Sequence, residues 1–370
     1  MSVIDVVVGA AFGSEGKGHI TAQLVQKRLD LGLDVLNIRV AGPNAGHTVL
    51  DSNMVPFPLR CIPVGAAIDD EVYLHIAAGS EVEPDVLFAE LALLRSEGHN
   101  VSRLTVSGEA TLLEEKHKTF EGERDLTGKL GSTGKGIGAA RAERIYREAK
   151  RVKDDIDFVT KLNEHGVGVT DINPGDQERF NAAWTTNTKG AIIIEGTQGY
   201  GLGLHAGFYP QCTSSDARAI DFLAMAGLSP WARGVERLDI WLVARVFPIR
   251  VAGNSGPLAG ETDWQTLGLP EERTTVTKKV RRVGAWDGKL IHDAVLANGG
   301  GQPNVHIALT MIDQLFPWLS GVNNLYAVKL EGVDAAEGKK FAEFLKKVES
   351  DAGAKIGVIS TSPNTVVWSA

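Results

Sequence analysis

Residues 3–30 have the sequence VIDVVVGAAFGSEGKGHITAQLVQKRLD, and this stretch decides the fold class. An apolar, β-branched run at 3–8 is followed by a glycine-rich turn and then by a helical pattern at 19–31. A strand, a glycine-rich turn and a helix N-terminus present backbone N–H groups and a positive dipole end to an anion. Lys17 adds a full positive charge, so the stretch predicts a phosphate-binding loop.

The turn departs from a standard P-loop at two positions. The pattern GxxxxGK[ST] requires glycine where Ala11 stands and serine or threonine where Gly18 stands, so the hydroxyl that would hold Mg²⁺ is absent. Taken alone, the segment is also compatible with a tight strand–helix turn that carries a surface lysine.

Similar apolar runs recur along the chain, with helical patterns between them. Further strands are predicted at 35–40, 72–77, 104–107, 191–194, 240–246, 305–309, 325–330 and 355–359, and further helices at 84–96, 139–150 and 335–348. The runs lack in/out alternation, which is typical of strands buried on both faces. The sequence therefore predicts an α/β fold with a large, mostly parallel central sheet flanked by helices. No linker or repeat interrupts the pattern, so we expect one domain over 1–370.

The composition limits the class of partner and the compartment. With 46 acidic and 38 basic residues the formal net charge is −8, which argues against nucleic acid as a partner. Cys61 and Cys212 form no CxxC pair, so neither a disulfide framework nor a zinc site is indicated. The first apolar run is too short for a signal peptide or a membrane span. We expect a cytoplasmic protein without a membrane partner.

A second loop, AGPNAGHT at 41–48, follows the strand predicted at 35–40. Ligands bind at strand ends in α/β sheets, so two such loops in succession indicate one crevice. His47 is a candidate donor to a phosphate oxygen, because its unperturbed pKa lies near neutrality. A structural or merely solvated histidine is the alternative.

Eight short motifs, met in order along the chain, carry a resemblance to a known family. They are GSEGKG (13–18), GPNAGHT (42–48), GSTGKGIG (131–138), EGTQG (195–199), YPQCTSS (209–215), KVRRVG (279–284), TMID (310–313) and STSP (360–363). They resemble GDEGKG, GHNAGHT, GTTGRGIG, EGAQG, YPYVTSS, the arginine-rich aspartate loop, TKLD and STGP of the adenylosuccinate synthetase family. With its flanking strands, the resemblance covers residues 3 to 365.

The resemblance implies a Mg²⁺-dependent ligase that works in two steps. O6 of a purine nucleotide attacks the γ-phosphate of a nucleoside triphosphate, and the amine of L-aspartate then displaces phosphate at C6. Charge develops on the transferring oxygens, so catalysis rests on positioning, metal and cationic or N–H donors. By this resemblance the catalytic residues are Ser14, Lys17, His47 and Gln198, with Mg²⁺ at Ser14 and at the carbonyl of Gly46.

The same resemblance assigns the binding residues. The substrate nucleotide is expected at Ser14, Asn44, Ser132, Thr133, Arg147, Gln198 and Thr213, and aspartate at Thr277, Lys279 and Arg281, with Arg282 as a further candidate. The triphosphate is expected at Gly13, Glu15, Gly16, Lys17, Gly18, Gly46, His47, Thr48, Arg281, Met311, Asp313, Ser360, Ser362 and Pro363. Arg147 aligns with an arginine that crosses a homodimer interface in the family, so a homodimer is implied.

Three departures from the family pattern bear on the substrates. Ser14 stands where the family has an aspartate that acts as base on purine N1–H, and a neutral hydroxyl cannot replace it near pH 7. Serine at this position resembles a phage-type branch, which makes N6-succino-2-amino-2′-deoxyadenylate from dGMP for 2-aminoadenine DNA. The protein would then act in the host cytoplasm.

The other two departures concern the phosphate donor and aspartate. Met311 replaces the lysine of TKLD, which recognises guanine together with the aspartate at Asp313, so ATP or dATP is predicted as donor. Lys279 and Val280 stand where the family has two arginines, so the grip on the aspartate carboxylates is expected to be looser or rearranged.

The alternatives come from different functional classes. An ordinary adenylosuccinate synthetase would use IMP and GTP, which Ser14 and Met311 argue against. A catalytically dead nucleotide-binding homologue would have lost the base, yet Lys17, His47 and Arg281 remain. A Rossmann dehydrogenase is disfavoured, because the first loop lacks GxGxxG and no acidic residue closes the second strand.

Overall fold

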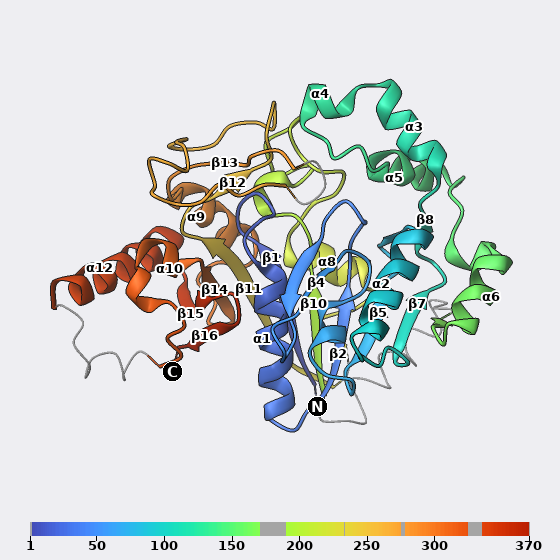
Figure 1. Ribbon diagram of the computed structural model, residues 1–370, viewed down its shortest axis with the longest axis horizontal. Coiled ribbons are helices and arrows are strands. Elements are labelled where there is room, and N and C mark those ends of the chain that lie inside the picture. The colour runs from blue at the N-terminus through green and yellow to red at the C-terminus, as the bar shows by residue number, and fades with distance from the viewer. Residues whose placement is uncertain (1, 171–189, 233, 275–277, 325–334, 370) are drawn as a thin grey trace. The chain divides into compact units, whose positions relative to one another are not determined.

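The computed structural model describes residues 2–170, 190–232, 234–274, 278–324 and 335–369 (Figure 1). The chain forms two compact units. The first unit comprises Met1–Val7, Lys17–Thr197 and Ala219–Asp239, and the second comprises Val8–Gly16, Gln198–Arg218 and Ile240–Ala370. The predicted site residues Gly13 to Gly16 of the first glycine loop therefore belong to the second unit, whereas Lys17 and Gly18 belong to the first.

The first unit is built on a parallel sheet with the strand order β1-β10-β2-β5-β7-β9. The strands are β1 (Ser2–Gly9), β10 (Gly190–Glu195), β2 (Asp34–Arg39), β5 (Tyr73–Ile76), β7 (Leu104–Ser107) and β9 (Gly168–Thr170). Every residue of β10 is buried, which explains why its sequence is a continuous apolar run rather than an alternating one. Parallel pairing brings the carboxyl ends of these strands to the same sheet edge.

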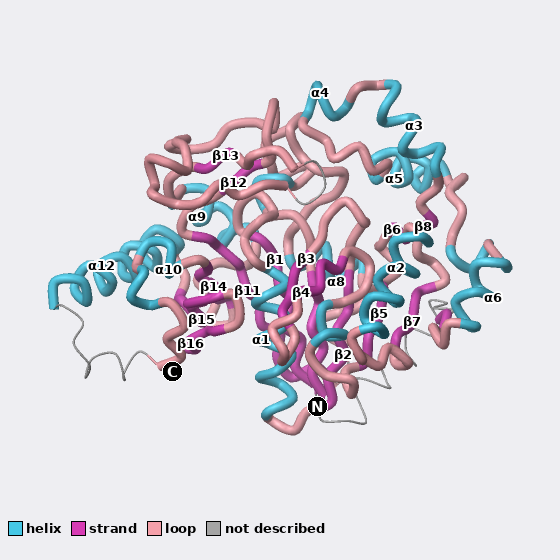
Figure 2. Tube along the Cα trace, in the orientation of Figure 1, coloured by secondary structure: helices cyan, strands magenta, loops and turns pink. Residues whose placement is uncertain are grey.

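Helices and short elements complete the first unit (Figure 2). They are α1 (Lys17–Asp30), β3 (His47–Leu50), β4 (Pro56–Leu59), η1 (Val64–Ala67), β6 (Glu81–Val82), α2 (Pro84–Ser96), β8 (Thr111–Leu112), α3 (Glu115–Glu123), α4 (Leu126–Leu130), α5 (Ile137–Tyr146), η2 (Val152–Asp154), α6 (Ile156–Glu164) and α8 (Ala219–Met225). Helix α1 begins at Lys17, directly after the glycine loop, and packs on β2, β10 and the β3–β4 hairpin.

The second unit has its own mostly parallel strands in the order β11-β14-β15-β16. These are β11 (Val235–Arg245, whose first residues belong to the first unit), β14 (Val305–Thr310), β15 (Lys355–Ser362) and the antiparallel β16 (Thr365–Trp368). The other elements are η3 (Tyr200–Leu202), β12 (Ile249–Arg250), β13 (Arg282–Val283), α9 (Gly288–Ala297), α10 (Ile312–Leu315), η4 (Pro317–Leu319) and α12 (Ala335–Ala352). Helices α9 and α12 pack against each other.

The predicted α/β class with a large, mostly parallel sheet is confirmed. Eight predicted strands correspond to β1, β2, β5, β7, β10, β11, β14 and β15, while the one predicted at 325–330 lies outside the described residues. The helix predicted at 139–150 is α5, and it ends earlier because Arg147 adopts a left-handed conformation with φ of 69°. Within the described ranges, no helix is both long and apolar enough to cross a membrane. The expectation of a single domain stays a prediction.

Candidate active site

The first glycine loop is held together from inside by Glu15. Its carboxylate, 1% exposed, accepts hydrogen bonds from the backbone N–H groups of Ala11 (3.2 Å) and Gly13 (2.6 Å). Its carbonyl oxygen accepts from the hydroxyl of Thr310 at 2.6 Å. Two N–H groups that a phosphate could otherwise use are therefore already satisfied. Glu15 therefore stabilises the conformation of the loop, and a bound phosphate would have to be contacted by other groups.

Ser14 is contacted by two arginines of the second unit. Its hydroxyl oxygen accepts a hydrogen bond from Arg281 Nη1, and its carbonyl oxygen accepts one from Arg245 Nη1 at 3.3 Å. Arg245 is in turn paired with the carboxylate of Glu272. Burial lowers the pKa of Arg281, although the guanidinium stays charged near neutrality. Ser14 is thus a neutral group that accepts hydrogen bonds from two guanidinium groups.

The segment after β10 packs against the glycine loop within the second unit. A Cβ on Gly13 would lie 3.2 Å from the Cα of Gln198, and a Cβ on Gly199 would lie 2.6 Å from the carbonyl oxygen of Ala11. Gln198 has a positive φ of 61°, so its backbone is tightly turned beside the loop. Thr213 is anchored through its N–H to the carbonyl of Leu202 at 2.7 Å. Ser14, Gln198 and the Thr213 segment therefore belong to one local framework.

Several residues predicted to bind the triphosphate also lie in the second unit, namely Met311, Asp313, Ser360 and Ser362. Met311 follows β14, and Ser360 and Ser362 end β15, which pairs with β14 in parallel. Met311 has a φ of 60°, and its Cε lies 3.9 Å from where a Cβ on Gly16 would stand. Burial raises the pKa of Asp313. The structure thus places an apolar, adaptable side chain over the glycine loop, at the position where the family motif has lysine.

The residues predicted to bind aspartate are only partly brought together. Thr277 lies outside the described residues, and the side chain of Lys279 is exposed. Arg282 donates two hydrogen bonds of 2.6 Å to the carboxylate of Glu261, so these guanidinium N–H groups are already used within the protein. Arg281 is the member of this group that contacts Ser14.

In the first unit, Lys17 and His47 lie together at the start of α1. A Cβ on Gly18 would lie only 2.5 Å from the Cβ of His47, so the backbone of α1 and the imidazole are in close contact. This packing explains why Gly18 stands where a P-loop has serine or threonine, since a side chain there would displace His47. Lys17 is 1% exposed and contributes to lowering the pKa of His47.

His47 belongs to a buried cluster with Arg39 and Glu195. Its Nδ1 contacts Glu195 Oε1 and lies 2.6 Å from Arg39 Nη1. Burial, reinforced by Arg39, lowers the pKa of His47 to about 4. Burial alone would raise the pKa of Glu195, but Arg39 and His47 outweigh it, and the carboxylate stays ionised. The ionised carboxylate accepts a hydrogen bond from the protonated Nδ1 of neutral His47, which leaves Nε2 as the ring nitrogen without a proton.

Sequence reasoning missed Arg39 and Glu195 as parts of the site. Glu195 Oε2 also accepts from the backbone N–H of Val64 at 3.0 Å, and Arg39 Nη2 donates to the carbonyl of Ala45 at 3.1 Å. Both are charged residues at the ends of apolar strands and are fully buried. A buried charge at a strand end was the available signal, because such charges persist only when paired.

The loop at 131–138 is shaped by Glu121 of α3. Its carboxylate accepts from the backbone N–H groups of Gly136 (2.9 Å) and Gly138 (3.0 Å) at the start of α5. Ser132 and Thr133 are half-buried in the loop that precedes this turn. Arg147 is exposed and donates to the carbonyl of Ile145 at 3.2 Å. Of the loop at 42–48, Asn44 is half-buried, while Gly46 and Thr48 are exposed.

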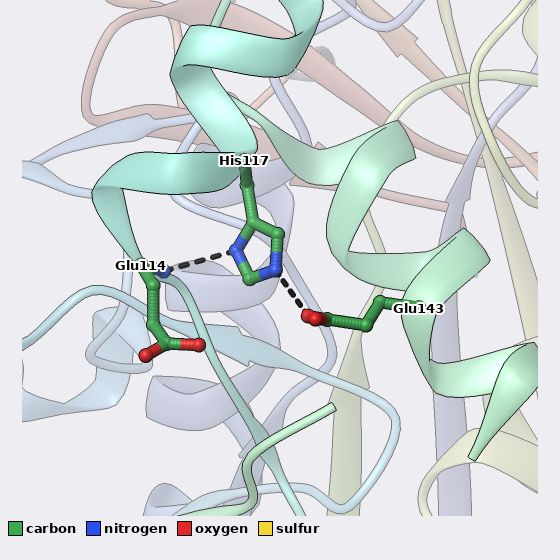
Figure 3. A group of neighbouring side chains, drawn as sticks. All are labelled: Glu114, His117 and Glu143. Carbon is green, nitrogen blue, oxygen red and sulfur yellow. Dashed lines mark hydrogen bonds and ion pairs between the residues drawn. The ribbon is translucent and has the colours of Figure 1, made fainter. Parts of the chain in front are cut away.

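A cluster of Glu114, His117 and Glu143 joins α3 to α5 and has the composition of a metal site (Figure 3). His117 Nδ1 accepts from the backbone N–H of Glu114 at 3.0 Å, so Nε2 carries the proton and donates to Glu143 at 2.5 Å. Lys116 Nζ lies 2.8 Å from Glu114 and 2.7 Å from Glu143. With both ring nitrogens used and a lysine supplying the positive charge, the cluster is an ion-pair network that fastens α3 to α5.

The two predicted Mg²⁺ ligands fit the ion unequally. Mg²⁺ prefers carboxylate and phosphate oxygens. The hydroxyl of Ser14 accepts from a guanidinium, whose charge opposes a cation, so Ser14 fits poorly. Gly46 is exposed, and its carbonyl oxygen is of a suitable type.

Comparison with known proteins agrees with these motifs. The profile of the family described as Adenylosuccinate synthetase matches residues 6–166 and 169–325. Adenylosuccinate synthetase of Pyrococcus horikoshii is 33% identical over 364 residues, which cover 97% of this chain and 95% of the relative. That of Methanocaldococcus jannaschii is 33% identical over 363 residues, which cover 97% and 94%.

Two solved structures have a similar fold. One is the cyanophage S-2L succinoaminodeoxyadenylate synthetase (PurZ) bound to dGMP and to dATP as an energy donor, with a TM-score of 0.74, 25% identity and coverage of 99% of this chain and 95% of that chain. The other is a fully ligated adenylosuccinate synthetase from Plasmodium falciparum, with a TM-score of 0.73, 21% identity and coverage of 99% of both chains. At 21% identity the second shows likeness of fold alone.

Proposed function

The chain belongs to the adenylosuccinate synthetase family of carbon–nitrogen ligases, and we propose that it joins L-aspartate to C6 of dGMP with ATP or dATP as phosphate donor. The product is N6-succino-2-amino-2′-deoxyadenylate, a precursor for 2-aminoadenine DNA. O6 attacks the γ-phosphorus, the bond to the β–γ bridging oxygen breaks, and the N1 proton is released. The aspartate amine then attacks C6 and loses a proton as phosphate leaves.

The observation that carries the choice of dGMP is the environment of Ser14. The hydroxyl is small, neutral and hydrogen-bonded to Arg281, so no carboxylate at this position competes with substrate for that guanidinium. The smaller side chain leaves space for the 2-amino group of guanine. A PurZ structure that binds dGMP and dATP supports this choice as a neighbour in fold.

Met311 supports an adenine donor. In the family motif a lysine at this position frames guanine together with the following aspartate, whereas methionine offers only apolar contact. Asp313 is retained, so the difference from the family motif at this site lies in Met311.

The chain's own groups supply positioning and charge. Lys17 stabilises the transferring phosphoryl group, and neutral His47, oriented by Glu195, presents Nε2 toward phosphate. A phosphate oxyanion at Nε2 favours proton uptake by the imidazole, which then donates to it. The exposed carbonyl oxygen of Gly46 would hold Mg²⁺, which would neutralise phosphate charge when the triphosphate is bound.

An ordinary synthetase that uses IMP and GTP is the second candidate, and the names of the 33% identical relatives favour it. A substrate matrix distinguishes the two. Purified protein, L-aspartate and Mg²⁺ are incubated with dGMP, GMP or IMP against ATP, dATP or GTP, and products are read by mass spectrometry. Product from dGMP with an adenine donor supports the proposal. Product from IMP with GTP alone establishes an ordinary synthetase, and no product in any combination points to an inactive homologue.

We also propose a homodimer in which Arg147 reaches the neighbouring site. Arg147 is exposed, and Ile145 and Tyr146 beside it are 71% exposed, so apolar surface next to Arg147 is available for burial against a second copy. Sedimentation of the purified protein, with and without nucleotide, tests this state. A monomer under all conditions contradicts it.

A further inference from the structure

Glu272 links the two arginines that contact Ser14. Its Oε1 accepts from Arg245 Nη2 at 2.7 Å and its Oε2 accepts from Arg245 Nη1 at 3.1 Å. Its backbone carbonyl accepts from the N–H of Arg281 at 2.8 Å. Arg245 then donates to the carbonyl of Ser14, and Arg281 donates to its hydroxyl. All four residues lie in the second unit, so one glutamate holds both contacts to the loop.

The charges make this arrangement dependent on the carboxylate. Arg245 is 3% exposed, and a buried guanidinium is stable only when it is paired. Its other side-chain contacts are long, at 3.3 Å to Ser14 and 3.4 Å to Gln314, whereas Glu272 supplies a bidentate pair. Burial alone would raise the pKa of Glu272, but Arg245 outweighs it and keeps the pKa below its usual value. The pair is therefore ionised near neutral pH.

We infer that Glu272 is a positioning residue, which acts through Arg245 and Arg281 to fix Ser14 and to aim the Arg281 guanidinium. This inference rests on the proposed function, in which Ser14 meets the purine and Arg281 meets the aspartate carboxylate. Glu272 itself touches no reacting atom. Loss of its charge leaves the buried Arg245 without its bidentate partner. Residue 272 then moves as this pair rearranges, and its backbone contact to Arg281 moves with it.

The test compares three variants of the full-length protein. Glu272→Gln keeps the shape and removes the charge, and its amide N–H₂ group opposes one arm of the guanidinium. Glu272→Asp keeps the charge on a shorter side chain. Glu271→Gln is the matched control, because the neighbouring Glu271 pairs with Arg273 at the surface.

With dGMP and ATP, Glu272→Gln is expected to raise the KM for L-aspartate by about tenfold or more and to leave the KM for ATP within about twofold. Glu272→Asp should recover part of this loss, and Glu271→Gln should match the wild type. Equal changes in all three Michaelis constants, or Glu272→Gln kinetics like those of the control, would overturn the inference.

A second readout needs no turnover, and so separates this inference from the proposed substrate. Amide hydrogen exchange in peptides spanning 9–17 should be faster by about tenfold in Glu272→Gln and unchanged in Glu271→Gln. If wild type makes no product from dGMP, the proposed function fails while this comparison still decides the role of Glu272. Unchanged exchange in Glu272→Gln overturns it. If Glu272→Gln does not fold, the Glu272→Asp variant gives the same comparison with an intermediate effect expected.

Discussion

The Arg281 guanidinium donates a hydrogen bond to the hydroxyl oxygen of Ser14. A serine leaves the charge of that guanidinium uncompensated by its partner, so the donor groups of Arg281 stay available to an anionic substrate. An aspartate at the same position would form a charge-assisted pair with Arg281 and would fill the space beside the purine. The residue at position 14 therefore determines both the charge and the space available at the proposed nucleotide site.

Ser14→Asp tests this relationship. We expect kcat/KM for dGMP to fall by about tenfold or more and kcat/KM for IMP to rise, because the carboxylate occupies space and offers a base for N1–H. Ser14→Ala is the control, since it removes the hydroxyl without adding charge or size, and it should retain the preference for dGMP. Unchanged kcat/KM for both nucleotides in Ser14→Asp would count against the steric account.

Gly18→Ala tests the packing of His47 on the start of α1. The new Cβ would lie 2.5 Å from the Cβ of His47, so the imidazole must move from its place beside Lys17. We expect kcat to fall by about a hundredfold, with a loss of stability of about 1–3 kcal/mol. Gly122→Ala in α3 is the control, because nothing lies within 4 Å of its Cβ, and it should stabilise the fold by up to about 1 kcal/mol. Wild-type kcat in Gly18→Ala would contradict this account.

Met311→Lys tests the choice of phosphate donor. Restoring the lysine of the family motif should raise kcat/KM for GTP relative to ATP by about tenfold. Met54→Lys is a matched control, since Met54 also has a positive φ, of 65°, against 60° for Met311. Steady-state rates with each donor give the ratio directly. If the ratio of kcat/KM for GTP to that for ATP is the same in Met311→Lys as in wild type, residue 311 does not determine which purine base the donor carries.

Acid should destabilise the protein through His75. This side chain is fully buried in β5, and burial lowers the pKa of His75 to about 4. The unfolded chain binds the proton near pH 6.5, so it holds more protons than the folded chain as pH falls, and stability decreases between about pH 6.5 and 4. The His75 contribution to this loss is about 3 kcal/mol at most.

Urea unfolding of wild type and His75→Gln at pH 7 and pH 4.5 measures this effect. The variant should lose less stability than wild type over that interval, whatever its stability at pH 7. An equal pH dependence in both proteins would contradict this account, because it would mean that His75 binds the same number of protons in the folded and the unfolded state.

The parallel strands were predictable because each is a continuous apolar run between glycine-rich turns. Short elements were not: β3 and β4 have only four residues each, and Pro56 and Pro58 occupy half of β4. The contacts within the candidate site could not be predicted from the sequence either. His47 and Glu195 are 148 residues apart, and Ser14 and Arg281 are 267 apart, so no local pattern predicts their pairing. The motifs identified Ser14, His47 and Arg281 as candidates but not Arg39 or Glu195, and the structure shows which of these residues are hydrogen-bonded to one another.

The central claim is that this ligase prefers dGMP, and direct competition tests it. Equal concentrations of dGMP and IMP are incubated with L-aspartate, Mg²⁺ and excess ATP, and the two succinylated products are quantified by mass spectrometry early in the reaction. The product ratio equals the ratio of the two kcat/KM values and does not depend on enzyme concentration. We predict that N6-succino-2-amino-2′-deoxyadenylate exceeds adenylosuccinate by about tenfold or more. A mixture dominated by adenylosuccinate would contradict the account.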